Sequence, residues 1–245
     1  YRGNMLEQYR GWPTLLSELC DGENLTSEKT ELVLSEILSG EVDPSQISAF
    51  LIALKVKGET TEEIIGLVRA MLNASEPLSL PENAIDIVGT GGSLQRREAA
   101  LNVSTMASFV AAASGAVVCK HGNRRASSTS GAFDLLDALG LPLDQTPMQV
   151  AEQVKSKNLG FAFAKTFHPA MRFAGPVRAG IGVPTVFNIL GPLSHPGRIK
   201  RHLIGTVNSE LAKQMAEVLL ENGSKHAWIV TGETGIDEIS VTGTT

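Results

Sequence analysis

The sequence has little of three things, and each shortage excludes a class of protein. Its two cysteines, Cys20 and Cys119, lie far apart, so they form neither a metal-binding spacing nor a disulfide framework. Its formal net charge is −5, whereas a general nucleic-acid binder would need a broad basic face. No apolar run is long enough to span a bilayer, and we find no signal-peptide pattern at the first residues. We therefore expect a cytoplasmic protein with reduced cysteines and with no nucleic-acid or membrane partner.

What remains is an ordinary globular composition. The 245 residues are 42% hydrophobic, 19% charged and 5% aromatic, enough for one large domain or for a two-domain enzyme. Residues 12–75 predict four short helices, because apolar residues recur at helical spacing between cap and stop signals. The helices are expected from Trp12 to Cys20, from Ser27 to a stop at Gly40, from Asp43-Pro44 to Gly58, and from a cap at Thr60 or Thr61.

From Pro81 onward, strands alternate with helices, which favours a mainly parallel sheet covered by helices. The expected strands lie at 85–88, 116–119, 160–164, 203–207 and 227–230, and the expected helices at 107–115, 130–139, 146–156 and 209–221. Residues 168–193 interrupt this pattern with a helical stretch punctuated by proline and glycine, including a helix that begins near Pro176. We therefore expect an α/β protein with a small all-helical N-terminal domain (1–79 and 168–193) and a mainly parallel-sheet domain covered by helices (80–167 and 194–245).

The stretch around which the chain is organised is 86–92, DIVGTGG, followed ten residues later by NVST at 102–105. An apolar run predicts a buried strand, and the glycines allow a turn whose backbone can approach a ligand closely. Hydroxyl groups and a helix N-terminus then follow, and together these features favour binding of a phosphate. The alternative is a tight strand-to-helix turn with no ligand, and this stretch alone does not decide between the two.

Three further groups of polar residues are candidates for a site. The run 120–125, KHGNRR, follows the second expected strand, where open α/β sheets place ligands, although it would equally suit a solvated basic loop. His121 is either part of such a site or a satisfied loop histidine. Arg178 offers a planar clamp for a carboxylate, although a lone arginine usually lies on the surface. Asp237 and Glu238 on a loop after a strand suit Mg²⁺, or else form a solvated acidic turn. The apolar run 187–193 is interpreted as structural.

Taken in order, these motifs resemble those of the anthranilate phosphoribosyltransferases. They are GTGG, NVST, KHGNR, a serine-rich loop, VRxxIG, FNxLGPL and IDE, and the match runs from about residue 12 to the end of the chain. The resemblance implies a helical domain joined by hinges to an α/β domain, homodimers formed through the helical domain, and transfer of phosphoribosyl from 5-phosphoribosyl 1-pyrophosphate (PRPP) to anthranilate in tryptophan biosynthesis. Because members of the family continue roughly a hundred residues further, we also expect a truncated C-terminus.

The resemblance also implies roles for individual residues. PRPP would be bound by residues of the glycine turn, the next helix and the basic loop: Gly89, Gly92, Ser93, Asn102, Ser104, Thr105, Lys120, Asn123, Arg124, Ser127 and Ser128. Anthranilate would contact Gly89, His121, Asn123, His168 and Arg178. Ser104 and Glu238 would ligate one Mg²⁺, and Asp237 with Glu238 a second. No residue is assigned as a catalytic base, because an aniline nitrogen is already an adequate nucleophile.

The sequence departs from the family pattern in the loop after the glycine turn. Ser93 replaces an aspartate, Ala100 stands at a threonine position, and the loop 94–99, LQRREA, is about three residues longer. Ala132 also replaces a frequent serine. Arg96 and Arg97 compensate by charge, or else the loop serves a different substrate. Two alternatives to the transferase therefore stay open: a pyrimidine nucleoside phosphorylase-like enzyme, and a catalytically silent ligand-binding paralogue.

Overall fold

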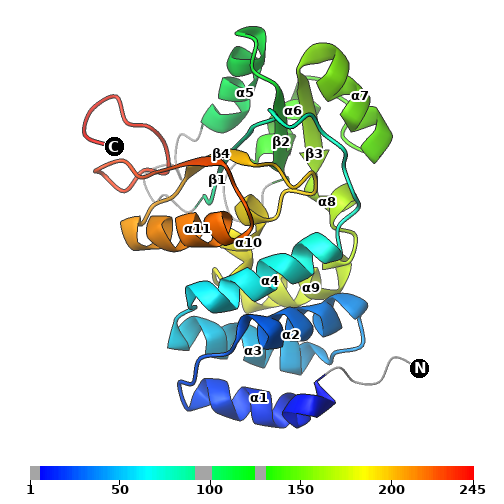
Figure 1. Cartoon of the computed structure of the whole chain (residues 1–245), viewed down its shortest axis with the longest axis vertical. Coiled ribbons are helices and arrows are strands. Elements are labelled where there is room, and N and C mark those ends of the chain that lie inside the picture. Colours follow the sequence, from blue (N-terminus) through cyan, green and yellow to red (C-terminus); the bar gives the residue numbers. More distant parts are fainter. Residues whose placement is uncertain (1–5, 92–100, 125–130) are drawn as a thin grey trace. The chain divides into compact units, whose positions relative to one another are not determined.

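The computed structural model describes residues 6–91, 101–124 and 131–245, which form two compact units (Figure 1). Unit 1 contains the described residues up to Ser75 together with His168–Leu190. Unit 2 contains the described residues of Glu76–Phe167 and Gly191–Thr245. The boundaries expected from the sequence, at 79 and 193, lie a few residues beyond those of the structure. In the described part, no helix is both long and apolar enough to cross a membrane.

Unit 1 is helical. Its elements are η1 Glu7–Tyr9, α1 Gly11–Cys20, α2 Ser27–Ser39, α3 Pro44–Lys57, α4 Thr61–Asn73 and α9 Met171–Ile181, with the first residues of α10 Phe187–Leu193. The four predicted helices start within one or two residues of their signals, and the first three also end there. Thr26 caps α2 by accepting the Lys29 N–H, and Thr60 with Glu63 forms a capping box at α4. Helix α9 returns to this unit and packs against α2 and α3 (Figure 1).

The expected start of α9 near Pro176 is wrong, because the helix begins at Met171 and carries Pro176 in its interior. Proline costs a helix one hydrogen bond and crowds the preceding turn, so this helix needs support from packing. Phe173 in its first turn provides it. A Cβ at Gly40 would lie 2.5 Å from the Phe173 ring, so the ring rests directly on the backbone that ends α2. Tertiary packing therefore supports a helix that continues through the proline at which it was expected to begin.

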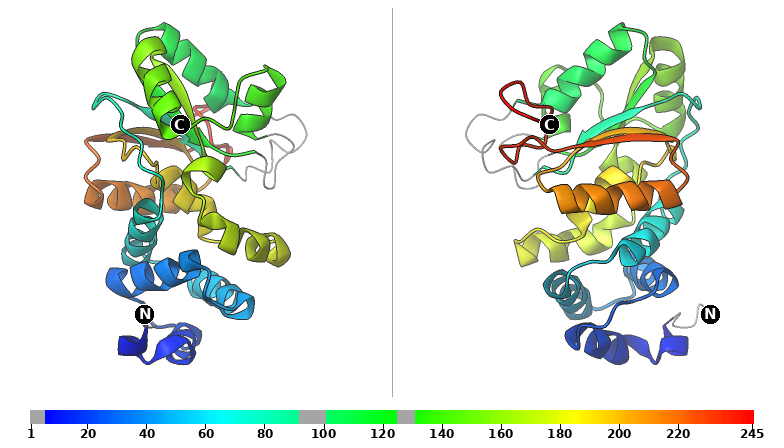
Figure 2. Two further views of the ribbon diagram at one scale, coloured as in Figure 1. Left: turned by 90° about the vertical axis from the view of Figure 1, so that its right-hand side faces the viewer. Right: turned by 60° about the vertical axis from the view of Figure 1, so that its left-hand side comes forward.

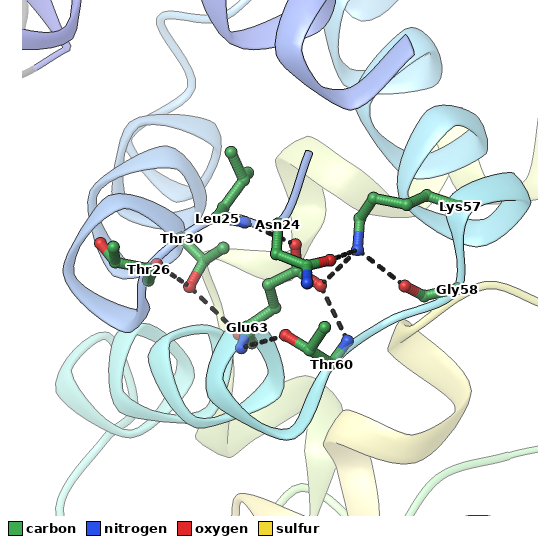
Figure 3. Close-up of polar contacts among 8 residues, drawn as sticks. All are labelled: Asn24, Leu25, Thr26, Thr30, Lys57, Gly58, Thr60 and Glu63. Carbon is green, nitrogen blue, oxygen red and sulfur yellow. Dashed lines mark hydrogen bonds and ion pairs between the residues drawn. The ribbon is translucent and has the colours of Figure 1, made fainter. Parts of the chain in front are cut away.

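A buried ion pair ties the start of α4 to its neighbours (Figure 3). Lys57 Nζ lies 2.9 Å from Glu63 Oε2, and both side chains are nearly inaccessible to solvent. The Glu63 carboxylate also accepts the backbone N–H groups of Leu25 (2.9 Å) and Thr60 (2.8 Å). Lys57 donates further to Asn24 Oδ1 and to the Gly58 carbonyl. Because both charged groups are paired and hydrogen-bonded, their desolvation is compensated.

Unit 2 contains five parallel strands, β1 Asp86–Gly89, β2 Val118–Gly122, β3 Leu159–Phe163, β4 Arg201–Gly205 and β5 His226–Val230. They form a sheet in the order β1-β4-β5 and a pair β2-β3, joined by a single bridge between Ile85 and Val118. The expected parallel sheet is therefore present, but it is divided between β1 and β2. The second strand also runs further than predicted, through Lys120 to Gly122.

The helices of unit 2 are α5 Val103–Ala113, α6 Ala132–Ala138, α7 Pro147–Lys157, α8 Ala164–Phe167 and α11 Ser209–Glu221. Figure 2 shows α11 on one side of the β1-β4-β5 sheet and α5 on the other. One apolar cluster lies beneath α7, around Cys119, Val154 and Phe167, and a second surrounds Phe133 beside β3. Helix α5 begins at Val103 instead of the predicted 107, so the NVST motif forms the first turn of the helix.

Candidate active site

The carboxyl end of β1 lies where the order of the strands reverses, because the chain passes from β1 to β2 on one side and later to β4 on the other. Ligands of open α/β sheets bind at such points. The strand continues into a turn in which the Thr90 N–H donates to the Gly205 carbonyl of β4 (2.8 Å). Gly91 has a φ of +69°, a conformation that favours glycine. The glycine turn predicted from the sequence is therefore at the expected ligand position.

Asp237 lies directly against this turn. It is 1% exposed, and its Oδ2 accepts the Gly91 N–H at 3.1 Å. A Cβ at Gly89 would lie 3.1 Å from the same oxygen, and a Cβ at Gly205 would lie 1.8 Å from the Asp237 carbonyl oxygen. Asp237 is thus seated against two strand ends, by its carboxylate at Gly89 and by its backbone at Gly205, and the alternative of a solvated acidic turn is wrong for this residue.

Sequence reasoning missed Gly205. In the sequence it closes an apolar strand and looks like any strand end, because the backbone that requires it lies more than thirty residues further along. The structure shows that no side chain fits there unless the loop that carries Asp237 moves. This loop is closed by a hydrogen bond from the Gly232 N–H to the Ile236 carbonyl (2.8 Å).

The expected metal ligands are two adjacent acidic residues and a serine. Asp237 and the half-buried Glu238 share the loop above, and Ser104 lies in the first turn of α5. Among the described residues, no group of three or more histidine, cysteine or acidic side chains is arranged to hold a metal ion. Two carboxylates with a hydroxyl nevertheless suit Mg²⁺, which prefers oxygen ligands and commonly completes its shell with water and substrate phosphates. The residues therefore fit Mg²⁺ bound together with a phosphate ligand.

Lys120 does not lie on a solvated basic loop, which was one of the two alternatives for this run. It belongs to β2 and is 2% exposed, and its ammonium donates to the Ile87 carbonyl and to Ser104 Oγ, the latter at 3.1 Å. Burial lowers the pKa of Lys120 to about 8, although the negative charges of Asp86 and Glu238 oppose the shift. The structure thus brings Ser104, another residue expected at the site, to the buried Lys120 ammonium.

Two other residues expected to bind PRPP lie at the start of α5. Asn102 precedes the helix, and its carbonyl accepts the N–H groups of Thr105 and Met106, each at 3.0 Å. The Thr105 side chain is fully buried. Its hydroxyl therefore packs inside unit 2 and is not displayed to solvent, which was not foreseen.

The remaining residues of the KHGN motif are held in different ways. His121 is 4% exposed; its backbone N–H donates to Asp86 Oδ1 (3.0 Å), and its Nδ1 lies 3.1 Å from the Gly191 carbonyl. Asn123 is exposed and accepts the Arg124 N–H at 2.8 Å. Arg124 is paired with Asp137 of α6 at 2.7 Å, so its charge is already partly neutralised.

Several predicted residues lie outside the described residues. They are Gly92 and Ser93, the long loop 94–99 with Ala100, and Ser127 and Ser128. The departures from the family pattern in residues 93–100 all lie in this part of the chain. Ala132, which replaces a frequent serine, is the first residue of α6.

Two residues expected to contact anthranilate belong to unit 1. His168 is 5% exposed, and its carbonyl accepts the Met171 N–H at the start of α9. Arg178 lies in α9, and its guanidinium stacks on the Phe187 ring, 4.9 Å from the ring centroid. Burial lowers the pKa of Arg178 from its usual value. In the described part of the chain, no carboxylate lies within 4.0 Å of this guanidinium, so the fork remains available to a planar anion.

Comparisons with known proteins agree with these motifs. Residues 81–245 match the model of the glycosyl transferase family, a/b domain, and residues 13–75 match that of its helical bundle domain. The chain is 43% identical to the anthranilate phosphoribosyltransferase of Streptomyces griseus over 235 residues, which cover 96% of this chain and 65% of that protein. It is 44% identical to that of Rhodopseudomonas palustris, over 95% of this chain and 68% of that protein.

Solved structures give the same result. The anthranilate phosphoribosyltransferase of Thermus thermophilus superposes with a TM-score of 0.84 at 43% identity, over 91% of this chain and 67% of that one. The Saccharomyces cerevisiae enzyme, solved in complex with PRPP and Mg, gives a TM-score of 0.83 at 32% identity, over 94% of this chain and 68% of that one. The chain thus spans about two thirds of the length of these relatives. With both domain models matched and this identity along nearly its whole length, the chain belongs to the anthranilate phosphoribosyltransferase family.

Proposed function

We propose that this protein transfers the phosphoribosyl group of PRPP to anthranilate in tryptophan biosynthesis. The observation that carries the proposal is the high identity to relatives of that name, combined with a buried Asp237 against the glycine turn of β1. The anthranilate nitrogen would form a bond to C1 of the ribose as the C1–O bond to pyrophosphate breaks. Pyrophosphate leaves with the electron pair, and the nitrogen then loses a proton.

In this proposal, unit 2 binds the donor. The turn at Gly89 and Gly91, with Gly92 and Ser93, would approach the PRPP phosphates, and Asn102, Ser104 and Thr105 would contribute from the start of α5. Lys120 would place one positive charge near the departing pyrophosphate. Such fixed charges favour the transition state, because negative charge builds up on the leaving group as the bond breaks. Asn123, Arg124, Ser127 and Ser128 would complete the donor contacts.

Asp237, Glu238 and Ser104 would hold Mg²⁺, with two ions in total. Mg²⁺, when bound, would supply charge neutralisation for the pyrophosphate and so make it a better leaving group. The protein's own residues would serve to fix the two carboxylates. Asp237 is held by the Gly91 N–H and by the close packing against Gly205, which supports a preorganised ligand set.

The acceptor would be held through its carboxylate by Arg178, whose guanidinium is already oriented by Phe187. His121, Asn123, His168 and Gly89 would provide further contacts to anthranilate. His121 is fixed at its Nδ1 by the Gly191 carbonyl, which supports a defined ring orientation. Helical unit 1 would also form a homodimer, and the protein would act in the cytoplasm.

The test is the loss of anthranilate fluorescence when purified protein is mixed with anthranilate, PRPP and Mg²⁺. We expect fluorescence to fall with stoichiometric release of pyrophosphate, and to stay constant when Mg²⁺ is chelated. Constant fluorescence under all conditions, with PRPP binding intact in calorimetry, would instead identify a silent paralogue. Phosphorolysis of thymidine or uridine in a parallel assay would favour the nucleoside phosphorylase alternative.

A further inference from the structure

Beyond the bridge between Ile85 and Val118, β1 and β2 no longer pair, and side chains fill the gap between the two strands. At the bridge, the two strands follow a regular parallel pattern: the Ile85 N–H donates to the Val117 carbonyl, and the Cys119 N–H donates to the Ile85 carbonyl. Continued regularly, the ladder would next join Ile87 to Cys119 and His121. The structure instead gives these backbone groups side-chain partners, so the strands separate toward their carboxyl ends.

Two charged side chains fill the first part of this gap. Asp86 Oδ1 accepts the His121 N–H at 3.0 Å, in place of the Ile87 carbonyl. Lys120 Nζ donates to that Ile87 carbonyl, in place of a backbone N–H. Both residues are buried, at 0% and 2% exposure. The His121 N–H and the Ile87 carbonyl therefore keep hydrogen-bond partners although the strands do not pair there.

A histidine is the third side chain that bonds to a backbone group in this gap. His195 Nδ1 accepts the Gly197 N–H (2.9 Å), so this nitrogen carries no proton and the ring proton lies on Nε2. That nitrogen lies 3.0 Å from the Cys119 carbonyl and donates to it. His195 thus takes the acceptor that would otherwise receive the Ile87 N–H. Its ring also stands edge-on to the His121 ring, with centroids 5.6 Å apart.

We propose that Asp86 and His195 are positioning residues for the donor site, holding β1 and β2 apart so that the Lys120 ammonium can reach Ser104. In a closed ladder, the Ile87 carbonyl would be satisfied by the His121 N–H and would not orient the lysine. With the gap open, Lys120 Nζ bridges from Ile87 to Ser104, at the start of α5. This inference rests on the proposed function, because it assigns the gap a role in PRPP binding.

The alternative is that these residues only satisfy a buried core. A core role would be shared by His202, which is buried in β4 beside Asp86 and hydrogen-bonds the Ile199 carbonyl at 2.9 Å, away from the gap. His202 is therefore a matched control. Substituting His202 removes a buried hydrogen bond from the same sheet, and this bond, to the Ile199 carbonyl, involves neither β2 nor Lys120 nor Ser104.

The experiment measures the affinity of the purified protein for PRPP with Mg²⁺ by calorimetry, in four forms: wild type, Asp86→Ala, Asp86→Asn and His202→Asn. Alanine removes the acceptor of the His121 N–H, and we expect affinity to fall by roughly tenfold or more. Asparagine keeps an oxygen at that position, so affinity should recover to within about threefold of wild type. His202→Asn should bind like wild type even if it unfolds at a lower temperature.

Three results would overturn the inference: wild-type affinity in Asp86→Ala, no recovery in Asp86→Asn, or an equal loss in His202→Asn. If Asp86→Ala does not fold, hydrogen exchange of the His121 amide in the wild-type protein decides, since the inference requires slow exchange at an amide without a strand partner. A wild type that does not bind PRPP overturns the proposed function together with this inference. Wild-type binding with an unaltered Asp86→Ala overturns the inference alone.

Discussion

Each unit buries a lysine and a carboxylate, but the two arrangements differ. In unit 1, Lys57 and Glu63 meet at 2.9 Å, and the carboxylate also accepts two backbone N–H groups. In unit 2, Asp86 and Lys120 each bond to the backbone of the opposite strand. Burial raises the pKa of Asp86 to about 7, although the positive charge of Lys120 opposes this shift.

The difference distinguishes an ion pair that stabilises the fold from charged groups that belong to a binding site. A buried ion pair with all its hydrogen bonds made fixes the helices around it and leaves no charge for a ligand. Charged groups that are buried without such pairing keep shifted pKa values, which are common at functional sites. The arrangement in unit 2 lies beneath the glycine turn and Ser104, which supports its assignment to the donor site.

The largest expected effect is on the scaffold. Lys57→Met leaves the Glu63 carboxylate buried without its partner, and we expect the free energy of unfolding to fall by about 3–5 kcal/mol. Urea denaturation followed by circular dichroism measures it. The double variant Lys57→Met with Glu63→Gln should recover part of the loss, because the unpaired charge is gone. A loss below about 1 kcal/mol in the single variant would show that the pair does not stabilise unit 1.

The second prediction concerns Gly205 in unit 2. Gly205→Ala places a Cβ where the Asp237 carbonyl oxygen lies, so the loop with Asp237 and Glu238 must move. We expect kcat/KM for PRPP to fall by about a hundredfold or more and the Mg²⁺ requirement to rise. Gly175→Ala is the matched control, since a Cβ there meets nothing within 4 Å. Unchanged Mg²⁺ dependence in Gly205→Ala would contradict the proposed seat of Asp237.

The third prediction compares two arginines of α9, each stacked on a phenylalanine. Arg178 lies 4.9 Å from the Phe187 centroid, and the exposed Arg172 lies 4.4 Å from that of Phe173. Arg178→Ala should raise the KM for anthranilate about tenfold, and Arg178→Lys should rescue little because the fork is lost. Arg172→Ala should leave this KM unchanged. Equal effects of the two alanine variants would remove Arg178 from the acceptor site.

The smallest effect is a pH dependence of stability with two opposing parts. The pKa of Asp86 rises on folding from 3.8 to about 7, so the folded state binds more protons and this contribution weakens as pH rises from 4 to 7. The pKa of His202 falls on folding from 6.5 to about 4, chiefly through burial, so its contribution strengthens as pH rises over 4 to 6.5.

Variants separate the two parts in urea denaturation between pH 4 and pH 7. Asp86→Asn should make stability rise more steeply with pH than in the wild type, because only the His202 contribution of this pair remains. His202→Asn should make stability rise less steeply with pH than in the wild type, because only the Asp86 contribution of this pair remains. Identical slopes in wild type and both variants would show that neither group changes its pKa on folding.

The sequence predicted the helices of unit 1 and the order of strands and helices in unit 2, because cap residues and apolar periodicity are local signals. It also predicted the glycine turn, and the resemblance added Ser104, Lys120 and the acidic pair as ligand-binding residues, a role that stays a prediction. It failed where the determining contact is distant in sequence. Lys120 looked like a loop residue, because its partners are the Ile87 carbonyl and Ser104. Gly205 gave no signal, because the backbone it accommodates belongs to residue 237.

The central claim is that PRPP binds at the carboxyl end of β1, between the glycine turn and the start of α5. A crystal structure of the protein with PRPP and Mg²⁺ tests it most directly. We predict that the pyrophosphate group lies against Gly89 and Gly91 within reach of Ser104 and Lys120, with Mg²⁺ on Asp237 and Glu238. A donor bound elsewhere, or bound here with Mg²⁺ away from both carboxylates, would contradict the account.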